Sequence, residues 1–454
     1  MQSNPIQQRI ETVCEKWEEA KKFRNARVVR LQCQPDELDM VDTFYNYAVA
    51  VDTPFYDIAF HFESRCFDVR DFSASLVNEL VEVLAIWNNS KKDDRIDYVP
   101  IEWTADYSSA NEKNPALLFV ENFNRLADAM QLPDDFFAVA IFKGASLDKV
   151  FLSWLRCAAE TEISNKVKFL FHEVITQPRF ESVAIKFPSL FATITLNLNM
   201  PKAMEQIAAM GDPLDPATPY RIAFSKMMNA MTAGKESDAE KRGHECIAIA
   251  MENLRKDPYW IMQVVVVNIA LGNDKIRYKK KKETLTYASK AVESATAAQS
   301  YFDNNVSGSL LSQALMFRGT VFYTQSIWSE AYTDFNTAFA LFCKDGNLPL
   351  AIEASRMGGQ SAIKSSQKKA GLTLWAEGAR LGKSMDADTA RASTFAALLK
   401  ALLAADYADF ISLDELHGIA ENLYGPDWVN VIRNWNKVPN ETVQQPQTEE
   451  LANA

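Results

Sequence analysis

Hydrophobic residues between positions 310 and 342 recur at the spacing of two amphipathic helices. In the first stretch they fall at i, i+3, i+4, i+8 and i+11, and in the second at i, i+4, i+7, i+8 and i+11. The positions are Leu311, Ala314, Leu315, Gly319 and Phe322, followed by Ala331, Phe335, Ala338, Phe339 and Phe342. Two such stripes joined by a short polar turn predict a helical hairpin, which cannot bury all its apolar surface alone. The pattern therefore predicts neighbouring hairpins stacked on this one.

The same helical periodicity extends over residues 220–410 without a strand-like run. The predicted helices are Tyr220–Thr232, Ser237–Leu254, Tyr259–Leu271, Lys280–Ala298, Leu310–Thr324, Ile327–Phe342, Pro349–Ser366 and Lys369–Lys383. Paired helices without strands are typical of a helical solenoid. Residues 411–437 predict two capping helices, the first opened by a capping box of Ser412 and Glu415, and the polar residues 438–454 are predicted to be disordered.

The N-terminal half shows a different pattern, in which β-prone runs alternate with helical periods. A polar amphipathic helix is predicted within residues 1–25, before the first run. The runs are ARVVRLQ, YDIAFHF, YVPIEW, FFAVAIF, VKFLF and FATITLNL. This alternation predicts, over residues 26–212, a mostly parallel sheet of about six strands with helices on both faces. The expected fold class is α/β plus all-α, and four prolines between Met200 and Tyr220 mark the boundary.

Charge and apolar run lengths restrict the classes of partner. The net charge of -11 argues against long-range attraction to nucleic acid or anionic lipid. The one strongly basic run, Arg277–Lys282, favours a solvated helix start and leaves RNA or lipid headgroup contact as the alternative. The longest apolar run, around Trp260–Gly272, is too short to span a bilayer, so we expect no membrane insertion. We therefore expect the partner to be another protein or peptide.

The cysteines and histidines predict neither disulfides nor a metal site. The six cysteines are scattered without a CxxC pair, which indicates reduced thiols in a cytoplasmic protein. The N-terminal residues lack the apolar run of a secretory signal, so we expect no export by that route. The four histidines lie in four different segments, and no catalytic constellation is evident. We accordingly expect no cofactor and no metal.

An α/β sheet can carry a nucleotide site, but the chain contains no G-x-x-x-x-G-K-[ST] loop. The nearest run, Lys143–Ser146, has one glycine and predicts a turn in which Ser146 caps the next helix. The strand VKFLFHEV ends in His172 and Glu173, where nucleotide hydrolases carry two acids. We interpret this pair as structural and keep a catalytic role as the alternative. In its layout alone, the N-terminal half resembles a degenerate nucleotide-binding domain joined to helical repeats.

The hairpin described first resembles the tetratricopeptide repeat. The matching positions are Leu315, Gly319 and Phe322 in the first helix and Ala331, Phe335 and Ala338 in the second. A second copy keeps Gly358 and Ala370 at the same separation, with Leu374 in place of the aromatic residue. The two copies are 39 residues apart, which exceeds the roughly 34-residue period of the family. The resemblance covers residues 220–405.

The resemblance implies a curved stack whose first helices line a groove for a peptide or helix of another protein. The exposed first-helix positions that it implies are Gln313, Met316, Thr320, Tyr323, Ile352 and Ser355. Contact with solvent or with another part of the same chain is the alternative for these residues. We expect a non-enzymatic protein-binding adaptor or chaperone, for example in a bacterial secretion or effector system. The alternative is a signalling nucleotide hydrolase with a divergent ATP or GTP site and a repeat sensor domain; the sequence indicates no oligomeric state.

Overall fold

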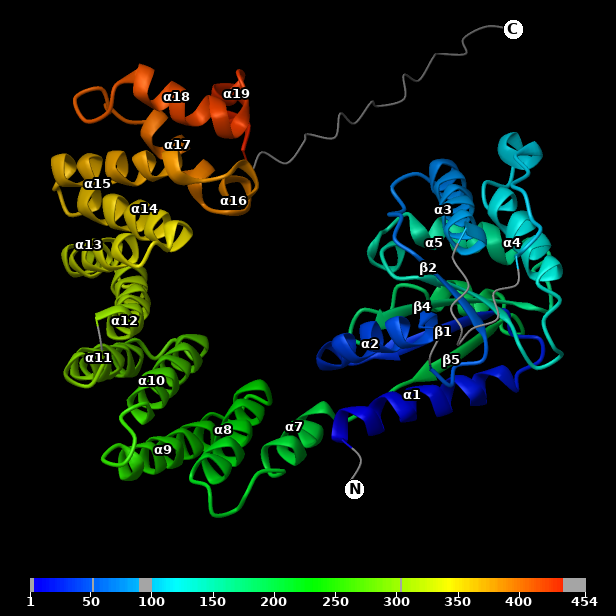
Figure 1. The fold of residues 1–454 in the computed structure, drawn as a ribbon, viewed down its shortest axis with the longest axis horizontal. Coiled ribbons are helices and arrows are strands. Elements are labelled where there is room, and N and C mark those ends of the chain that lie inside the picture. The colour runs from blue at the N-terminus through cyan, green and yellow to red at the C-terminus, as the bar shows by residue number, and fades with distance from the viewer. Residues whose placement is uncertain (1–3, 51–52, 90–99, 303, 436–454) are drawn as a thin grey trace, which may run out of the picture. The chain divides into compact units, whose positions relative to one another are not determined.

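The computed structural model describes residues 4–50, 53–89, 100–302 and 304–435, and the chain divides into two compact units, Met1–Ile207 and Ala208–Ala454 (Figure 1). The N-terminal unit contains a parallel sheet covered by helices, and the C-terminal unit is a run of packed helices. The predicted fold class, α/β plus all-α, is therefore confirmed. The tail predicted to be disordered, residues 438–454, lies outside the described residues.

Five parallel strands form the sheet of the N-terminal unit, in the order β2-β3-β4-β1-β5. The strands are β1 Val28–Cys33, β2 Ile58–Phe62, β3 Ala138–Phe142, β4 Val167–Val174 and β5 Phe191–Thr195. The prediction of a strand in YVPIEW is wrong for its described residues, because residues 100–107 form no strand. The Ile101 N–H instead donates to Asn88 Oδ1 at 2.9 Å, and the Trp103 indole donates to the Asn122 carbonyl at 3.1 Å. Polar groups of two helices thus hold this segment outside the sheet.

Side chains alternate across the sheet and form one apolar core on each face. Ala140, Phe142 and Phe169 face a core shared with α3 (Val69–Asn89), α4 (Leu117–Ala129) and α5 (Phe151–Ala159). The intervening residues Ile141 and Leu170 face a second core with α1 (Pro5–Lys21) and α2 (Leu38–Val49). The short helices α6 (Glu181–Lys186) and α7 (Met200–Ala208) flank β5 in sequence. The predicted parallel sheet with helices on both faces is confirmed.

The C-terminal unit begins with eight helices that pack one against the next in sequence order (Figure 1). They are α8 Ala217–Thr232, α9 Glu236–Asn253, α10 Trp260–Arg277, α11 Lys281–Ala297, α12 Asn304–Thr324, α13 Trp328–Lys344, α14 Leu348–Lys364 and α15 Lys368–Arg380. All eight predicted helices are confirmed. The eight helices form four hairpins, and the first helices of these hairpins are α8, α10, α12 and α14. They begin 43 or 44 residues apart, so the hairpins follow one another as a helical repeat.

Small residues on the first helices allow close approach of the second helices. A Cβ added at Gly319 would lie 3.0 Å from the Phe335 ring, and one at Gly358 would lie 2.7 Å from Leu374 Cδ2. Leu374 thus has the same place in the hairpin of α14 and α15 that Phe335 has in the hairpin of α12 and α13. In both hairpins a glycine of the first helix therefore packs against a large side chain of the second helix.

The four turns within the hairpins share one backbone geometry. The second residue after each first helix has a positive φ: Gly234 +69°, Lys279 +57°, Ser326 +64° and Ser366 +67°. The next residue donates its N–H to a carbonyl five residues earlier, for example Ile327 to Phe322 at 2.9 Å. This is the Schellman arrangement, in which glycine is the favoured left-handed residue. Only the first of the four hairpins has a glycine at this position.

Replacing Ser326 or Ser366 by glycine is expected to raise the free energy of unfolding by about 1 kcal/mol each. The substitution removes the Cβ that disfavours a left-handed backbone. Glycine also increases the conformational entropy of the unfolded chain, but this destabilising effect is the smaller of the two. Urea unfolding followed by circular dichroism measures the change. As a control, Ala340→Gly on the exposed side of α13 is expected to destabilise by a similar amount. Destabilisation by Ser326→Gly and Ser366→Gly would contradict the turn geometry.

Four short helices close the C-terminal end of the repeat. They are α16 Ala387–Ala392, α17 Phe395–Leu403, α18 Leu413–Tyr424 and α19 Trp428–Asn434. Ser412 caps α18 by accepting the Glu415 N–H at 3.1 Å, as predicted. The Glu415 carboxylate pairs with Arg380 and Lys383 and does not accept the Ser412 N–H, so only the Ser412 half of the predicted capping box forms. Across the described residues, no helix has the combination of length and apolar character needed to cross a bilayer.

Candidate functional site

Three of the six predicted groove residues lie together on α12. Gln313 and Thr320 are exposed, and Met316 between them is half-buried. Their spacing of three and four residues places them on one side of the helix. The Thr320 hydroxyl donates to the Met316 carbonyl at 2.8 Å, so its methyl group and the Met316 thioether are the apolar groups available. We call Gln313, Met316 and Thr320 the α12 face.

Tyr323, the fourth predicted residue, is engaged by the next hairpin. The Lys364 ammonium donates to the Tyr323 hydroxyl at 3.0 Å and lies 4.5 Å from the centroid of its ring. The same ammonium lies 4.2 Å from the Trp328 ring centroid. A cation held between two aromatic rings stabilises their arrangement. Tyr323 therefore joins the ends of α12 and α14, a role that the sequence analysis missed because it depends on a lysine 41 residues away.

The prediction that Ile352 and Ser355 are exposed is wrong, because both side chains are fully buried. Ile352 belongs to an apolar core that includes Phe395, Leu398 and Leu399 of α17. The Ser355 hydroxyl donates to the Leu374 carbonyl of α15 at 2.8 Å. Helix α17 lies within the range predicted to be repeats, and it folds onto the side of α14 that was expected to continue the groove.

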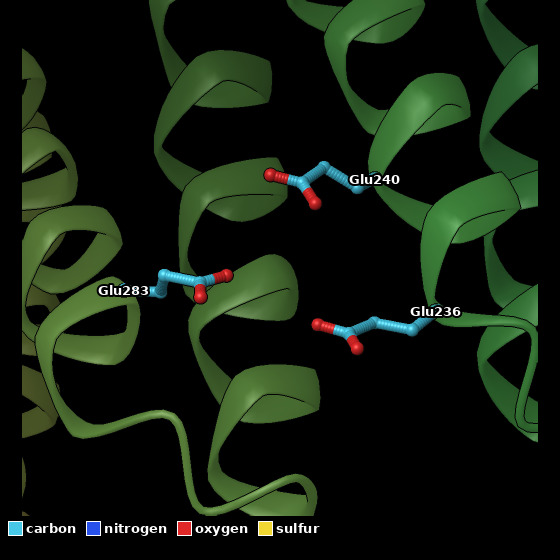
Figure 2. Close-up of side chains that lie close together, drawn as sticks. All are labelled: Glu236, Glu240 and Glu283. Atoms are coloured by element: carbon cyan, nitrogen blue, oxygen red, sulfur yellow. The ribbon is translucent and has the colours of Figure 1, made fainter.

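Three carboxylates and a buried lysine form a charge cluster in the C-terminal unit. Glu236 and Glu240 of α9 and Glu283 of α11 point toward a common centre (Figure 2). The Lys275 ammonium of α10 occupies that centre, 2.5, 2.8 and 3.1 Å from the three carboxylates. The Lys275 side chain is only 1% exposed. The carboxylate oxygens lie as close together as the ligands of a metal ion, but the Lys275 ammonium of the protein itself lies between them.

Two residues of the basic run Arg277–Lys282 are bound within the protein. Lys280 pairs with Glu236 at 2.9 Å, and the Arg277 guanidinium donates to the Met231 carbonyl at 2.6 Å. Hydrogen bonds from Lys275 lower the pKa of Glu236 and Glu240 below the ordinary value. Burial alone would lower the pKa of Lys275, but its three glutamate partners raise it overall. These charges join α9, α10 and α11, which accounts for part of the run without a nucleic-acid ligand.

The carboxylate of Glu173, the acid at the end of β4, is bound by four neighbouring donors. Its carboxylate accepts from Gln32 Nε2 at 3.1 Å and pairs with Arg30 at 3.0 Å. It also accepts the backbone N–H groups of Arg179 and Phe180 at 3.0 and 3.2 Å. A carboxylate that accepts several hydrogen bonds in a buried position fastens the chain locally. The geometry therefore favours the structural interpretation of Glu173 over the catalytic one.

His172, the neighbour of Glu173, lies on the opposite face of β4. Its Nδ1 lies 3.3 Å from the Tyr45 hydroxyl of α2. Burial lowers the pKa of His172 to about 4, so the imidazole is neutral at pH 7. A neutral, buried histidine with one tyrosine partner stabilises the packing of α2 on the sheet.

The predicted turn after β3 forms, but Ser146 does not have its predicted role. The Ser146 hydroxyl donates to the Lys143 carbonyl at 2.8 Å, and α5 begins only at Phe151, so the prediction that Ser146 caps this helix is wrong. The nearby Asp148 carboxylate instead binds the Arg65 guanidinium and the Cys66 N–H. Like Glu173, this acid holds a loop at the carboxyl end of the sheet.

Comparison of the chain with protein-family models, with curated proteins and with solved structures found no match.

Proposed function

We propose that the protein is a non-enzymatic adaptor or chaperone whose C-terminal helical repeat binds another protein. The single observation that supports this most is the uninterrupted packing of eight helices, with α12 presenting exposed side chains on one face. Stacked helical hairpins form extended surfaces that bind peptides or helices. Service in a bacterial secretion or effector system remains one specific form of the proposal.

The α12 face suits a mainly apolar peptide or helix with a few polar contacts. Met316 offers a flexible, polarisable thioether that adapts to different partners. Gln313 and Thr320 flank it and offer amide and hydroxyl groups on the exposed surface. We restrict the proposed surface to these three residues, because Ile352 and Ser355 are buried and Tyr323 is bound to Lys364.

The chemistry of the N-terminal unit also supports a non-enzymatic role. Glu173, the acid that a hydrolase at this position would use, accepts four donors within the protein. The competing hydrolase requires Glu173 to leave these donors and bind Mg²⁺. We further propose a cytoplasmic location, supported by six cysteines that are all free thiols.

A double substitution on the α12 face tests the proposed function. Met316→Glu with Thr320→Glu places two charges on the proposed surface and is expected to reduce recovery of a specific partner more than tenfold, which corresponds to about 1.4 kcal/mol. Quantitative affinity purification from the native source measures the change. The control is Thr333→Glu with Thr337→Glu, on the exposed side of α13. Equal recovery of every co-purifying protein with both double variants would contradict the proposal.

A further inference from the structure

A cavity of 860 Å³ opens at the amino ends of the strands in the N-terminal unit. Its walls come from the end of α1 and from the segments that precede β1, β2, β3 and β4. The walls include Lys21, Lys22, Arg24, Tyr56, Phe136 and Lys166. This volume lies in the range of small-molecule sites, which combine apolar or aromatic walls with a few polar groups. The cavity is at the opposite edge of the sheet from His172 and Glu173.

An aromatic pair forms part of the cavity wall. The Tyr56 and Phe136 rings are stacked with centroids 5.9 Å apart and planes at 18°. Tyr56 is 66% exposed although it packs on Phe136, so one of its surfaces remains open. An exposed aromatic face beside a cavity can stack with a planar ring, and such stacking tolerates many ring structures.

Positive charge accumulates behind and around this wall. Lys168 of β4 is fully buried, donates to the Ala26 carbonyl and lies 4.7 Å from the Phe137 ring centroid. The Arg27 guanidinium donates to the same carbonyl at 3.4 Å. Burial, together with the charges of Arg27 and Lys21, lowers the pKa of Lys168 to about 8. Keeping a charged lysine in this position is costly, because the position is buried and two further cations repel the charge.

The nearby acids balance these cations only in part, because the wall carries three acids, Glu18, Asp134 and Asp135, against four cations, Lys21, Lys22, Arg24 and Lys166. Asp57 already accepts from the Trp17 indole at 2.7 Å and the Phe137 N–H at 2.9 Å, and it pairs with Lys21 at 3.1 Å. Glu18 pairs with Lys21, and Asp134 pairs with Lys166 at 3.6 Å. Within the described part of the chain, Lys22 and Arg24 on the cavity wall have no ion pair. The excess of one cation on the wall, together with the buried Lys168 behind it, makes this cavity positive in a chain of net charge -11.

We propose that this cavity binds a small organic anion in which a planar aromatic ring carries a negatively charged group. The ring stacks on the open face of Tyr56, and the charged group lies among Lys22, Arg24 and Lys166. Binding neutralises part of the positive charge around Lys168. The site is independent of the protein-binding surface proposed on α12, so either proposal can fail without the other.

Calorimetric titration with four probes tests whether ring and charge are both required. Adenosine 5′-monophosphate and 2-naphthalenesulfonate carry both features, whereas adenosine lacks the charge and inorganic phosphate lacks the ring. At least one of the two complete probes is expected to bind with a Kd below about 1 mM, at least tenfold tighter than adenosine and phosphate. Preference between the two complete probes distinguishes a nucleotide-like ligand from an aryl anion. Absence of binding by both would overturn the proposal.

Substitutions locate the binding event. Tyr56→Ala is expected to weaken the better probe at least fivefold by removing the stacking surface. Lys22→Ala with Arg24→Ala, at two exposed positions, is expected to weaken it by a similar factor. Tyr107→Ala is the matched control, because this half-exposed tyrosine of the same unit donates to Asn78 and does not line the cavity. Equal affinities for Tyr56→Ala and Tyr107→Ala would refute the assignment.

Discussion

The substitution Lys275→Met is expected to lower the free energy of local unfolding of α9, α10 and α11 by about 3 kcal/mol. The change leaves three carboxylates, Glu236, Glu240 and Glu283, within 4.8 Å of one another without the ammonium that now lies between them. Their mutual repulsion, together with the lost hydrogen bonds, opposes the packing of the three helices. Hydrogen exchange of peptides from these helices measures the loss, because a repeat array need not unfold in a single step.

Lys280→Met is the matched control for this prediction. Lys280 is 41% exposed and pairs with Glu236 and Glu283 from outside the cluster, so its removal is expected to have a much smaller effect. Millimolar Ca²⁺ is expected to restore part of the lost protection in Lys275→Met, since carboxylate oxygens are suitable calcium ligands. Equal losses for Lys275→Met and Lys280→Met would contradict the central position of Lys275 in the network.

Acidification from pH 7 to pH 5 is expected to destabilise the N-terminal unit through His172 by about 2 kcal/mol. The pKa of His172 is lowered to about 4 by burial, whereas an unfolded histidine titrates near 6.5. Between these values the unfolded chain binds a proton that the folded chain does not. This contribution is therefore fully present above pH 6.5 and is lost as the pH falls toward 4. Hydrogen exchange of β3 and β4 peptides at both pH values measures it.

His172→Asn removes the titrating group while keeping a polar atom near Tyr45. In this variant, acidification is expected to reduce the exchange protection of β3 and β4 by about 2 kcal/mol less than it does in the wild type. His417→Asn, on the exposed surface of α18 in the other unit, serves as the control and is expected to retain the wild-type pH response of β3 and β4. A wild-type response in His172→Asn would contradict the assignment to this histidine.

Local patterns predicted most of the fold because helices and strands with one apolar face carry their period in the sequence. The hairpin of α12 and α13 illustrates this, since its apolar stripes, short turn and Gly319–Phe335 pair are all local in sequence. In YVPIEW the local pattern and the structure differ. Its residues are β-prone, yet Ile101 and Trp103 bind polar groups of two helices instead of joining the sheet. Tertiary contacts outweigh β-propensity at such positions.

The candidate surfaces were harder to predict because their composition depends on distant segments. Ile352 and Ser355 occur at groove-like spacings, but contacts with α17 and α15 bury them. The Lys275 cluster joins residues from three helices, and a basic run in the sequence gave no indication of its acidic partners. The cavity beside Tyr56 likewise combines α1 with the segments that precede four strands. Such sites follow from packing rather than from any one stretch of sequence.

Site-specific photo-crosslinking from the α12 face tests the proposed protein-binding function most directly. A photoreactive amino acid at Gln313, an exposed position, is expected to yield a covalent adduct with one protein in the native source. The same group at Thr337 on α13 is expected not to yield that adduct, and Met316→Glu with Thr320→Glu should reduce it more than tenfold. Absence of a specific adduct from Gln313, or the same adducts from Gln313 and Thr337, would contradict the account.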